Sequence, residues 1–419
     1  MDSKTTSVAL TSLAYDASAP GSLLYILQHL PSSSSSQRDL PAASSKGPQP
    51  KVPSHLKGDQ KAKAPNDNDK EKKKKKKDDN PPPPPPSAGG GKVTITSSVS
   101  GVIKMQDKAM VQGKANFTLD LGGKVVLQGA GLDFEDCSDF EVTRVVVDVG
   151  SASVQKNKLN GASIDCLTFN NCQRAYVHHN ELFHSTDETV NVGRGSDQVN
   201  FCNNVIALPM NNPALHNGEL HGYAAVMTSV APQAQNAMHH NFIVSCLSRM
   251  PRFDGAGLVD FSNNVVVNPG KVVGYDGPDS SATMNFYNNV VLTGPNSVDG
   301  LDLIKLNSSK SRVYLANNTM DGSPSSSVNL SQAKASSSTL LLASKASASW
   351  ASPLAQQQTQ LQPSNVKSWA QANLPQMTDL SQNLIKWLQQ ANLSAKASLP
   401  QQFDIQSTWV PVKLVAGSS

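Results

Sequence analysis

This chain of 419 residues lacks the features that mark several common protein classes. It has no run of roughly 18 apolar residues, the length that a membrane-spanning helix requires. It also has no glycine-rich phosphate loop, no Ser-His-Asp frame and no His-Glu-x-x-His zinc motif. Aromatic residues make up only 5% of the chain, so its core must be built from Val, Leu, Ile and Ala. We therefore expect no membrane span and none of the enzyme classes that those motifs define.

Cysteine is also scarce, and its spacing has no pattern. None of the cysteines forms a Cys-x-x-Cys pair or a zinc-like spacing, so a metal cluster and a redox motif are not supported. Several lie beside apolar strand residues, and we predict that they are buried small side chains. The five cysteines are Cys137, Cys166, Cys172, Cys202 and Cys246.

The net charge of +4 comes from one segment. Residues 46–79 hold twelve Lys against six acidic residues, so the remainder of the chain is slightly acidic. A lysine run of this kind is more often a solvated tract than a nucleic-acid site. We therefore expect no nucleic-acid partner.

Composition divides the chain into four segments. Residues 1–30 read as an N-terminal piece packed on the main domain, and residues 31–91, rich in Ser, Lys and Pro, read as a disordered insert. Residues 92–334 carry short runs of Val, Ile, Leu and Thr between Gly and Asn, which is typical of strands. Residues 335–419 form a tail rich in Ala, Gln and Ser, with one amphipathic helix predicted at 380–391.

An Asn-containing turn followed by an apolar run recurs through the strand region. The repeats lie at Asn180, Asn204, Asn241, Asn264, Asn289 and Asn318. Their gaps are 24, 37, 23, 25 and 29 residues, a period of about two dozen with one insertion, as in a solenoid. Units this small must stack on one another at about 4.8 Å, and parallel crossovers are right-handed. The sequence predicts an all-β right-handed parallel β-helix with stacked Asn turns, although a β-sandwich remains an alternative.

Carboxylates in two of these repeats form the first candidate site. Asp165 precedes Asp187 and Glu188 by about one coil, which would place the side chains on adjacent rungs. Converging oxygen ligands suit Ca²⁺, and Asn191 offers a further carbonyl oxygen. Solvated carboxylates on a turn are the alternative interpretation.

Two further clusters lie downstream. His221 and Tyr223 stand in the long insertion, where an ordinary loop is the alternative. Arg249 and Arg252 flank Pro251, which predicts an extended backbone with both guanidinium groups free to meet anions. An ordinary surface arginine pair is the alternative there.

Two histidine pairs, His178-His179 and His239-His240, raise the question of a metal site. Adjacent residues on a strand point to opposite faces, so neither pair can chelate one ion by itself. We predict that these rings stack in the core or in turns.

Taken in order along the chain, these fragments resemble the pectate lyase superfamily. The similarity covers about residues 18–30 and 93–322. The matching fragments are Gly21-Ser22-Leu23, Val99-Ser100-Gly101-Val102-Ile103, Thr186-Asp187-Glu188, His221-Gly222-Tyr223, His240-Asn241-Phe242, Ser248-Arg249-Met250-Pro251-Arg252-Phe253 and Asn263-Asn264-Val265. The resemblance implies a parallel β-helix of the pectin-lyase type and Ca²⁺-dependent β-elimination on α-1,4-polygalacturonate.

The resemblance also implies roles for individual residues. Asp165 and Asp187 fall on calcium-ligating acids, and Asn191 stands where many members have another Asp, which implies a less charged metal site. Arg249 falls on the family's catalytic base.

The substrate-binding positions follow the family less closely. Arg252 falls on a neighbouring basic position, and Asp254 stands where many members have another Arg. His221 and Tyr223 occupy the region of a lysine that classical members use near the cleft. A non-catalytic carbohydrate-binding or structural β-helix, and a lyase for another uronate polysaccharide, are therefore alternatives.

The resemblance further implies an extracellular protein whose partner is a pectate polysaccharide, and we expect a monomer. Residues 1–30 lack the basic and continuous apolar stretches of a signal peptide, so the sequence by itself predicts none. Secretion would make the Asn-x-Ser/Thr sites glycan acceptors. These sites are Asn116, Asn307, Asn317, Asn329 and Asn392.

Overall fold

The computed structural model describes part of the chain. The described residues are 6–30, 32, 91–150, 164–212, 219–330, 333, 340–347, 360–403 and 410–415. The insert predicted at 31–91 lies outside the described residues, except for its residues 32 and 91. Among the described helices, none is long and apolar enough to cross a membrane.

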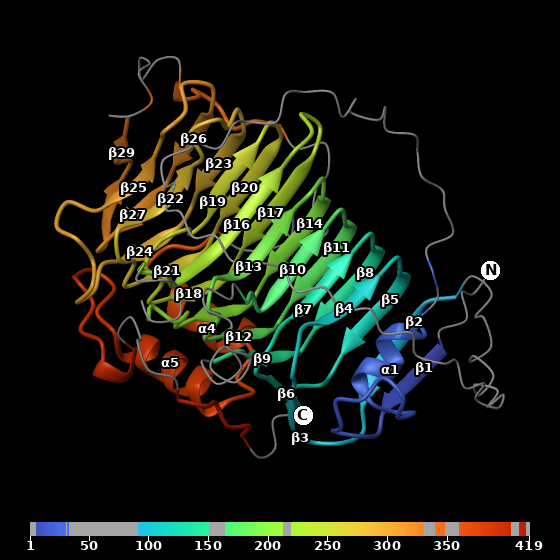
Figure 1. Cartoon of the computed structure of the whole chain (residues 1–419). Coiled ribbons are helices and arrows are strands. Elements are labelled where there is room, and N and C mark those ends of the chain that lie inside the picture. Colours follow the sequence, from blue (N-terminus) through green and yellow to red (C-terminus); the bar gives the residue numbers. More distant parts are fainter. Residues whose placement is uncertain are drawn as a thin grey trace, which may run out of the picture. The chain divides into compact units, whose positions relative to one another are not determined.

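Three sheets built from short strands make up the body of the protein (Figure 1). In hydrogen-bonded order, sheet 1 contains β1 (Thr6–Leu10), β2 (Val93–Ser97), β5 (Ala115–Asp120), β8 (Ser138–Thr143), β11 (Gln173–His178), β14 (Asp197–Cys202), β17 (Gln235–His239), β20 (Leu258–Ser262), β23 (Thr283–Tyr287) and β26 (Arg312–Ala316). Sheet 2 contains β3 (Gly101–Lys104), β6 (Val125–Gln128), β9 (Val146–Asp148), β12 (Glu181–Phe183), β15 (Val205–Ala207), β18 (Phe242–Val244), β21 (Val265–Val267), β24 (Val290–Leu292), β27 (Asn318–Met320) and β28 (Ser323–Ser325). Sheet 3 contains β4 (Ala109–Gln112), β7 (Leu132–Glu135), β10 (Leu167–Asn170), β13 (Glu188–Gly193), β16 (Tyr223–Ser229), β19 (Arg252–Gly255), β22 (Val272–Asp276), β25 (Asp302–Lys305) and β29 (Val328–Asn329).

From β2 to β27 the chain visits the sheets in the fixed order 1, 2, 3 and then returns to sheet 1 one rung further along. Each strand pairs in parallel with the equivalent strand of the next coil; among the described strands, β27 and β28 form the one antiparallel pair. This arrangement is a parallel β-helix, so the predicted fold class is confirmed and the β-sandwich alternative is wrong.

The predicted Asn repeat forms a ladder inside the bend between sheets 1 and 2. The side-chain Oδ1 of each Asn accepts a hydrogen bond from the backbone N–H of the preceding Asn at 2.9–3.1 Å, from Asn180 through to Asn318. Each of these residues is at most 1% exposed, so the ladder satisfies polar groups that water cannot reach.

The left-handed conformation belongs to the residue before each ladder Asn, for example His179 (φ 53°) and His240 (φ 54°). The histidine pairs therefore lie at these bends, where the Nδ1 atoms of His178 and His179 lie 2.7 Å apart.

The interior of the coil is filled by small aliphatic residues and a few stacked rings. Phe117, Phe134, Phe140 and Phe169 stack from coil to coil with centroids 5.0–6.4 Å apart. The five cysteines are free and buried, in agreement with the sequence prediction.

The N-terminal segment closes one end of this core. Strand β1 adds to sheet 1 by pairing in parallel with β2. Helix α1 (Leu23–Gln28) begins at Ser22, whose hydroxyl accepts the Tyr25 N–H, and buries Leu23, Ile26 and Leu27.

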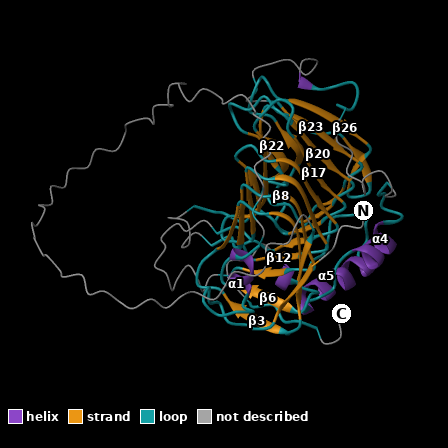
Figure 2. Ribbon diagram, turned by 90° about the vertical axis from the view of Figure 1, so that its right-hand side faces the viewer, coloured by secondary structure: helices purple, strands orange, loops and turns teal. Residues whose placement is uncertain are grey.

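The C-terminal segment covers the outer face of sheet 2 with α4 (Val366–Asn373), α5 (Asp379–Gln390) and the short 3₁₀ helix η2 (Gln401–Phe403). Figure 2 shows α4 and α5 along one side of the strands. Six three-residue strands of sheet 2 are buried at every position: β9, β12, β15, β18, β21 and β24. In β18, Ile243 belongs to the interior core, while Phe242 and Val244 pack with the C-terminal helices.

A buried carboxylate joins these two layers. Glu181 of β12 is fully buried and accepts hydrogen bonds from the Met377 N–H and from the hydroxyls of Thr378 and Ser381, the last two at 2.6 Å. Burial raises the pKa of Glu181 to about 7, although these hydrogen bonds act in the opposite direction.

This pKa predicts a pH dependence of stability. Because the folded protein holds the Glu181 proton more tightly than the unfolded chain, the stabilisation is complete below about pH 4 and is lost as pH rises towards 7. The loss amounts to up to about 3 kcal/mol. We expect Glu181→Gln to reduce the pH dependence of the unfolding free energy measured between pH 4 and 8. Glu135→Gln, at a partly exposed glutamate of β7, is the control, and an unchanged slope in Glu181→Gln would contradict the assignment.

Candidate functional site

Sheet 3 carries a row of polar side chains that the strand register brings together. Asn191 pairs with Thr168 on one neighbouring strand and with Val226 on the other, and Val226 pairs with Arg252. Arg252 in turn pairs with Tyr275. Residues far apart in the sequence therefore lie on successive rungs of one sheet.

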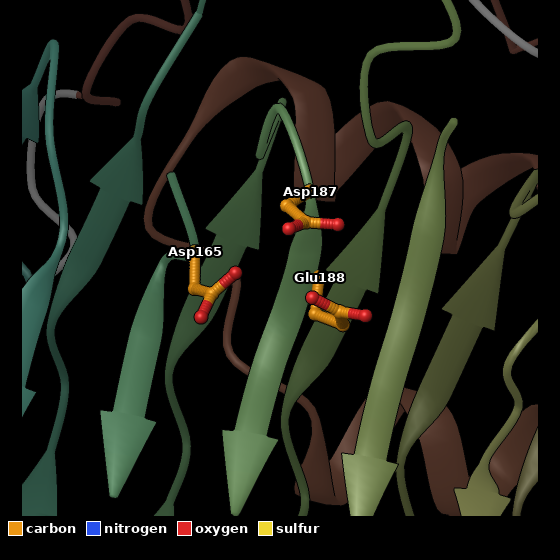
Figure 3. A group of neighbouring side chains, drawn as sticks. All are labelled: Asp165, Asp187 and Glu188. Atoms are coloured by element: carbon orange, nitrogen blue, oxygen red, sulfur yellow. The ribbon is translucent and has the colours of Figure 1, made fainter. Parts of the chain in front are cut away.

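Three carboxylates gather at the start of two adjacent strands in this sheet. Asp165 lies just before β10, Asp187 lies just before β13, and Glu188 is the first residue of β13. Leu167 pairs with Val190, so Asp165 and Glu188, which lie two positions before them, also come together. Oxygen atoms of all three side chains lie within 4.8 Å of one another. Figure 3 shows the three carboxylates where two neighbouring strands begin.

The chemistry of Asp165 fits a bound cation. Its Oδ2 accepts hydrogen bonds from the Thr168 hydroxyl at 2.8 Å and from the Asn191 amide at 3.2 Å, but its Oδ1 is buried without a hydrogen-bond partner. Burial, together with the charge of Asp187, raises the pKa of Asp165 to about 6. A cation would supply the missing partner and offset the repulsion between the carboxylates.

Asn191 lies on β13, beside Asp165. Its amide nitrogen donates a hydrogen bond to Asp165, and its Oδ1 lies near Gly193. It supports Asp165 through a hydrogen bond, while Glu188 joins Asp165 and Asp187 in the acidic group. The sequence analysis had placed Glu188 in the same carboxylate cluster as Asp165 and Asp187.

Arg249 lies against this acidic group and is held by three neighbours. It forms an ion pair with Glu188, donates from Nε to the Tyr275 hydroxyl at 3.1 Å, and stacks its Cζ 3.8 Å from the centroid of the Tyr223 ring. Its side chain is only 18% exposed, so the pair is shielded from water. The prediction that this guanidinium is free was wrong. Its backbone is not extended either, because φ at Arg249 is 62°.

Arg252 also has a carboxylate partner. Its Nε donates to Asp254 Oδ2 at 2.7 Å, and Asp254 Oδ1 accepts the Gly277 N–H at 2.7 Å. The prediction that its guanidinium is free was wrong too. Asp254 therefore neutralises the arginine next to it.

His221 and Tyr223 reach the same site. His221 Nε2 lies 3.6 Å from Asp187 Oδ1, and its ring centroid lies 4.6 Å from that of Tyr223. The 37-residue gap between Asn204 and Asn241 contains the loop that carries His221 to the start of β16.

Tyr275 was missed by the sequence analysis. It lies one coil after Arg249, in the fragment Val272–Asp276, and the only available signal was its place on the strand that follows the two arginines.

No family model matches the chain, and no curated protein matches its sequence. Its structure is similar to jun a 1, the major allergen from cedar pollen, with 13% identity over 68% of this chain and 81% of that chain and a TM-score of 0.38. A Bacillus subtilis pectate lyase variant has 15% identity over 64% of this chain and 68% of its own, with a TM-score of 0.44. A Xanthomonas campestris pectate lyase variant has 13% identity over 69% and 87%, with a TM-score of 0.41. At these values the similarity does not establish an activity.

The acidic group predicts that a divalent cation stabilises the folded protein. With Ca²⁺ as the probe, a hundredfold excess over Kd should add about 2.7 kcal/mol and raise the midpoint of thermal unfolding. Asp165→Asn should lose this shift, whereas Asp139→Asn, at an exposed residue of β8, should keep it. An equal shift in wild type and Asp165→Asn would show that the cation binds elsewhere.

Proposed function

We propose that this protein is a polysaccharide lyase that cleaves α-1,4-polygalacturonate by β-elimination. The observation that carries the proposal is the group Asp165, Asp187 and Glu188, with one buried and unpartnered oxygen of Asp165, directly beside Arg249, which precedes β19 of sheet 3. A cation site next to a guanidinium suits a substrate whose every sugar bears a carboxylate.

The reaction requires the proton on the ring carbon next to the carboxylate to leave, a ring double bond to form and the glycosidic oxygen to depart. This proton is weakly acidic, and its removal needs stabilisation of the charge that develops on the carboxylate. Asp165 and Asp187 would hold a Ca²⁺, with Asn191 beside them. When bound, this ion would supply positive charge against the sugar carboxylate.

Arg249 is the proposed proton acceptor. An arginine can accept a proton only when its guanidinium is neutral, and an ion pair stabilises its charged form. The role therefore requires that Glu188 leave Arg249 before the reaction. Tyr223, stacked on Arg249, and His221 are substitutes that need less perturbation.

The remaining polar groups would orient the chain of sugars. Arg252 is 32% exposed and lies one strand away from Tyr275, which contacts Arg249. Its pairing with Asp254 leaves it fewer free donors for a sugar carboxylate. We propose His221 and Tyr223 as further contacts at the same end of the strands.

Binding without cleavage is the second candidate function. It is favoured by the two ion pairs, because Glu188 and Asp254 each neutralise an arginine that would otherwise be free to act on the substrate. Such a protein would bind the same polymer and release no product. Both functions imply a polymer found outside cells, and we propose an extracellular site of action on that ground.

The lyase proposal predicts a rise in absorbance from unsaturated uronide when the protein is incubated with polygalacturonate and Ca²⁺. A chelator should stop the rise, and Arg249→Ala should lower the rate by roughly 10²-fold or more. Arg174→Ala removes an arginine that is paired with Asp139 on sheet 1, so it is the matched control and should keep the wild-type rate.

Three other outcomes separate the alternatives. Product from another polyuronate alone would identify a lyase of different specificity. Binding of polygalacturonate without any product, by a protein whose fold is intact, would favour the binding function. An Arg249→Ala variant as fast as wild type would remove Arg249 from the reaction.

A further inference from the structure

Arg249 and a cation bound to the acidic group would compete for the carboxylate of Glu188. Glu188 belongs to the acidic group with Asp165 and Asp187, and it forms the ion pair with Arg249. Its side chain is only 5% exposed, so water does not screen either interaction well. A divalent ion that binds the three carboxylates would be a second cation close to the guanidinium.

Arg249 accordingly neutralises part of the acidic group in the ion-free protein. Three carboxylates within 4.8 Å repel one another, and a guanidinium against one of them lowers that cost. When an ion enters, Glu188 gains a partner of higher charge, while Arg249 meets repulsion from the same ion.

We propose that Glu188 is exchanged between Arg249 and the cation, so that cation binding releases Arg249 from its ion pair. This inference rests on the cation site of the proposed function and assigns Glu188 a role as a positioning residue for Arg249. Arg249 is freed towards the substrate only in the cation-loaded protein.

The neighbours of Arg249 allow such a release without loss of position. The Tyr223 ring and the Tyr275 hydroxyl contact the guanidinium independently of Glu188. Both residues begin or lie within strands of sheet 3, and they would keep the side chain at the site after its carboxylate partner has left. The exchange therefore needs a change of partner and no rearrangement of the sheet.

A double-mutant cycle on Ca²⁺ affinity, measured by calorimetry, tests the exchange. Arg249→Met removes the competing charge and keeps an apolar stem for Tyr223, so it should raise affinity by roughly fivefold or more. Glu188→Gln should lower affinity. When Arg249→Met is added to the Glu188→Gln variant, the affinity should change by less than about twofold, because no shared carboxylate remains.

The contrary result is that Arg249→Met raises Ca²⁺ affinity by the same factor in the wild type and in the Glu188→Gln variant. It would show that Arg249 acts on the ion only through space, and it would overturn the exchange. Arg252→Gln is the charge-matched control, since Arg252 pairs with Asp254, and its effect should be the same with or without Glu188. Circular dichroism checks the fold of each variant, and Arg249→Gln replaces Arg249→Met if the latter does not fold.

The outcomes also separate this inference from the proposed function. A non-additive cycle without any uronide product would support the exchange and contradict the lyase. Uronide production that is insensitive to a chelator, together with no measurable Ca²⁺ binding by wild type or Arg249→Met, would overturn the exchange and leave a cation-independent lyase.

Discussion

Parallel pairing between successive coils, held in register by backbone hydrogen bonds, is the constraint on which the rest of the structure depends. It fixes a spacing of about 4.8 Å between equivalent residues of neighbouring coils. Inside the coil this spacing stacks Asn amides on Asn amides and Phe rings on Phe rings. Where the strands of sheet 3 begin, the same spacing brings Asp165 next to Glu188, although Asp165 and Asp187 are 22 positions apart in the sequence.

The features that repeat with the coil were the ones the sequence could predict. The Asn period is visible because each coil needs the same polar group at the same bend, and the convergence of Asp165 and Asp187 follows from that period. The helix at 380–391 was predicted from one apolar face, and α5 buries Leu384, Ile385 and Leu388 there.

Features that depend on contacts between unrelated segments could not be predicted. Arg249, which pairs with Glu188, has a left-handed backbone (φ 62°), a conformation that is uncommon for residues other than glycine. The contact of Glu181 with Thr378 joins positions almost 200 residues apart in sequence. One signal was present and unused: strands such as Val265–Val267 are apolar at every position, as expected for a strand buried on both faces.

Charge balance links the fold to the proposed chemistry. Both arginines of the site are neutralised by carboxylates, and the acidic group keeps a buried oxygen of Asp165 without a hydrogen-bond partner. A divalent cation would resolve this imbalance and, by drawing on Glu188, change the state of Arg249. The site is thus arranged so that the ion and the guanidinium depend on one another.

A crystal structure of the protein grown with Ca²⁺ tests this account most directly. The account predicts an ion bound to Asp165, Asp187 and Glu188, with Arg249 separated from Glu188 and still in contact with Tyr223. An ion bound at these carboxylates while Arg249 keeps its ion pair with Glu188, or a site that stays empty at saturating Ca²⁺, would contradict it.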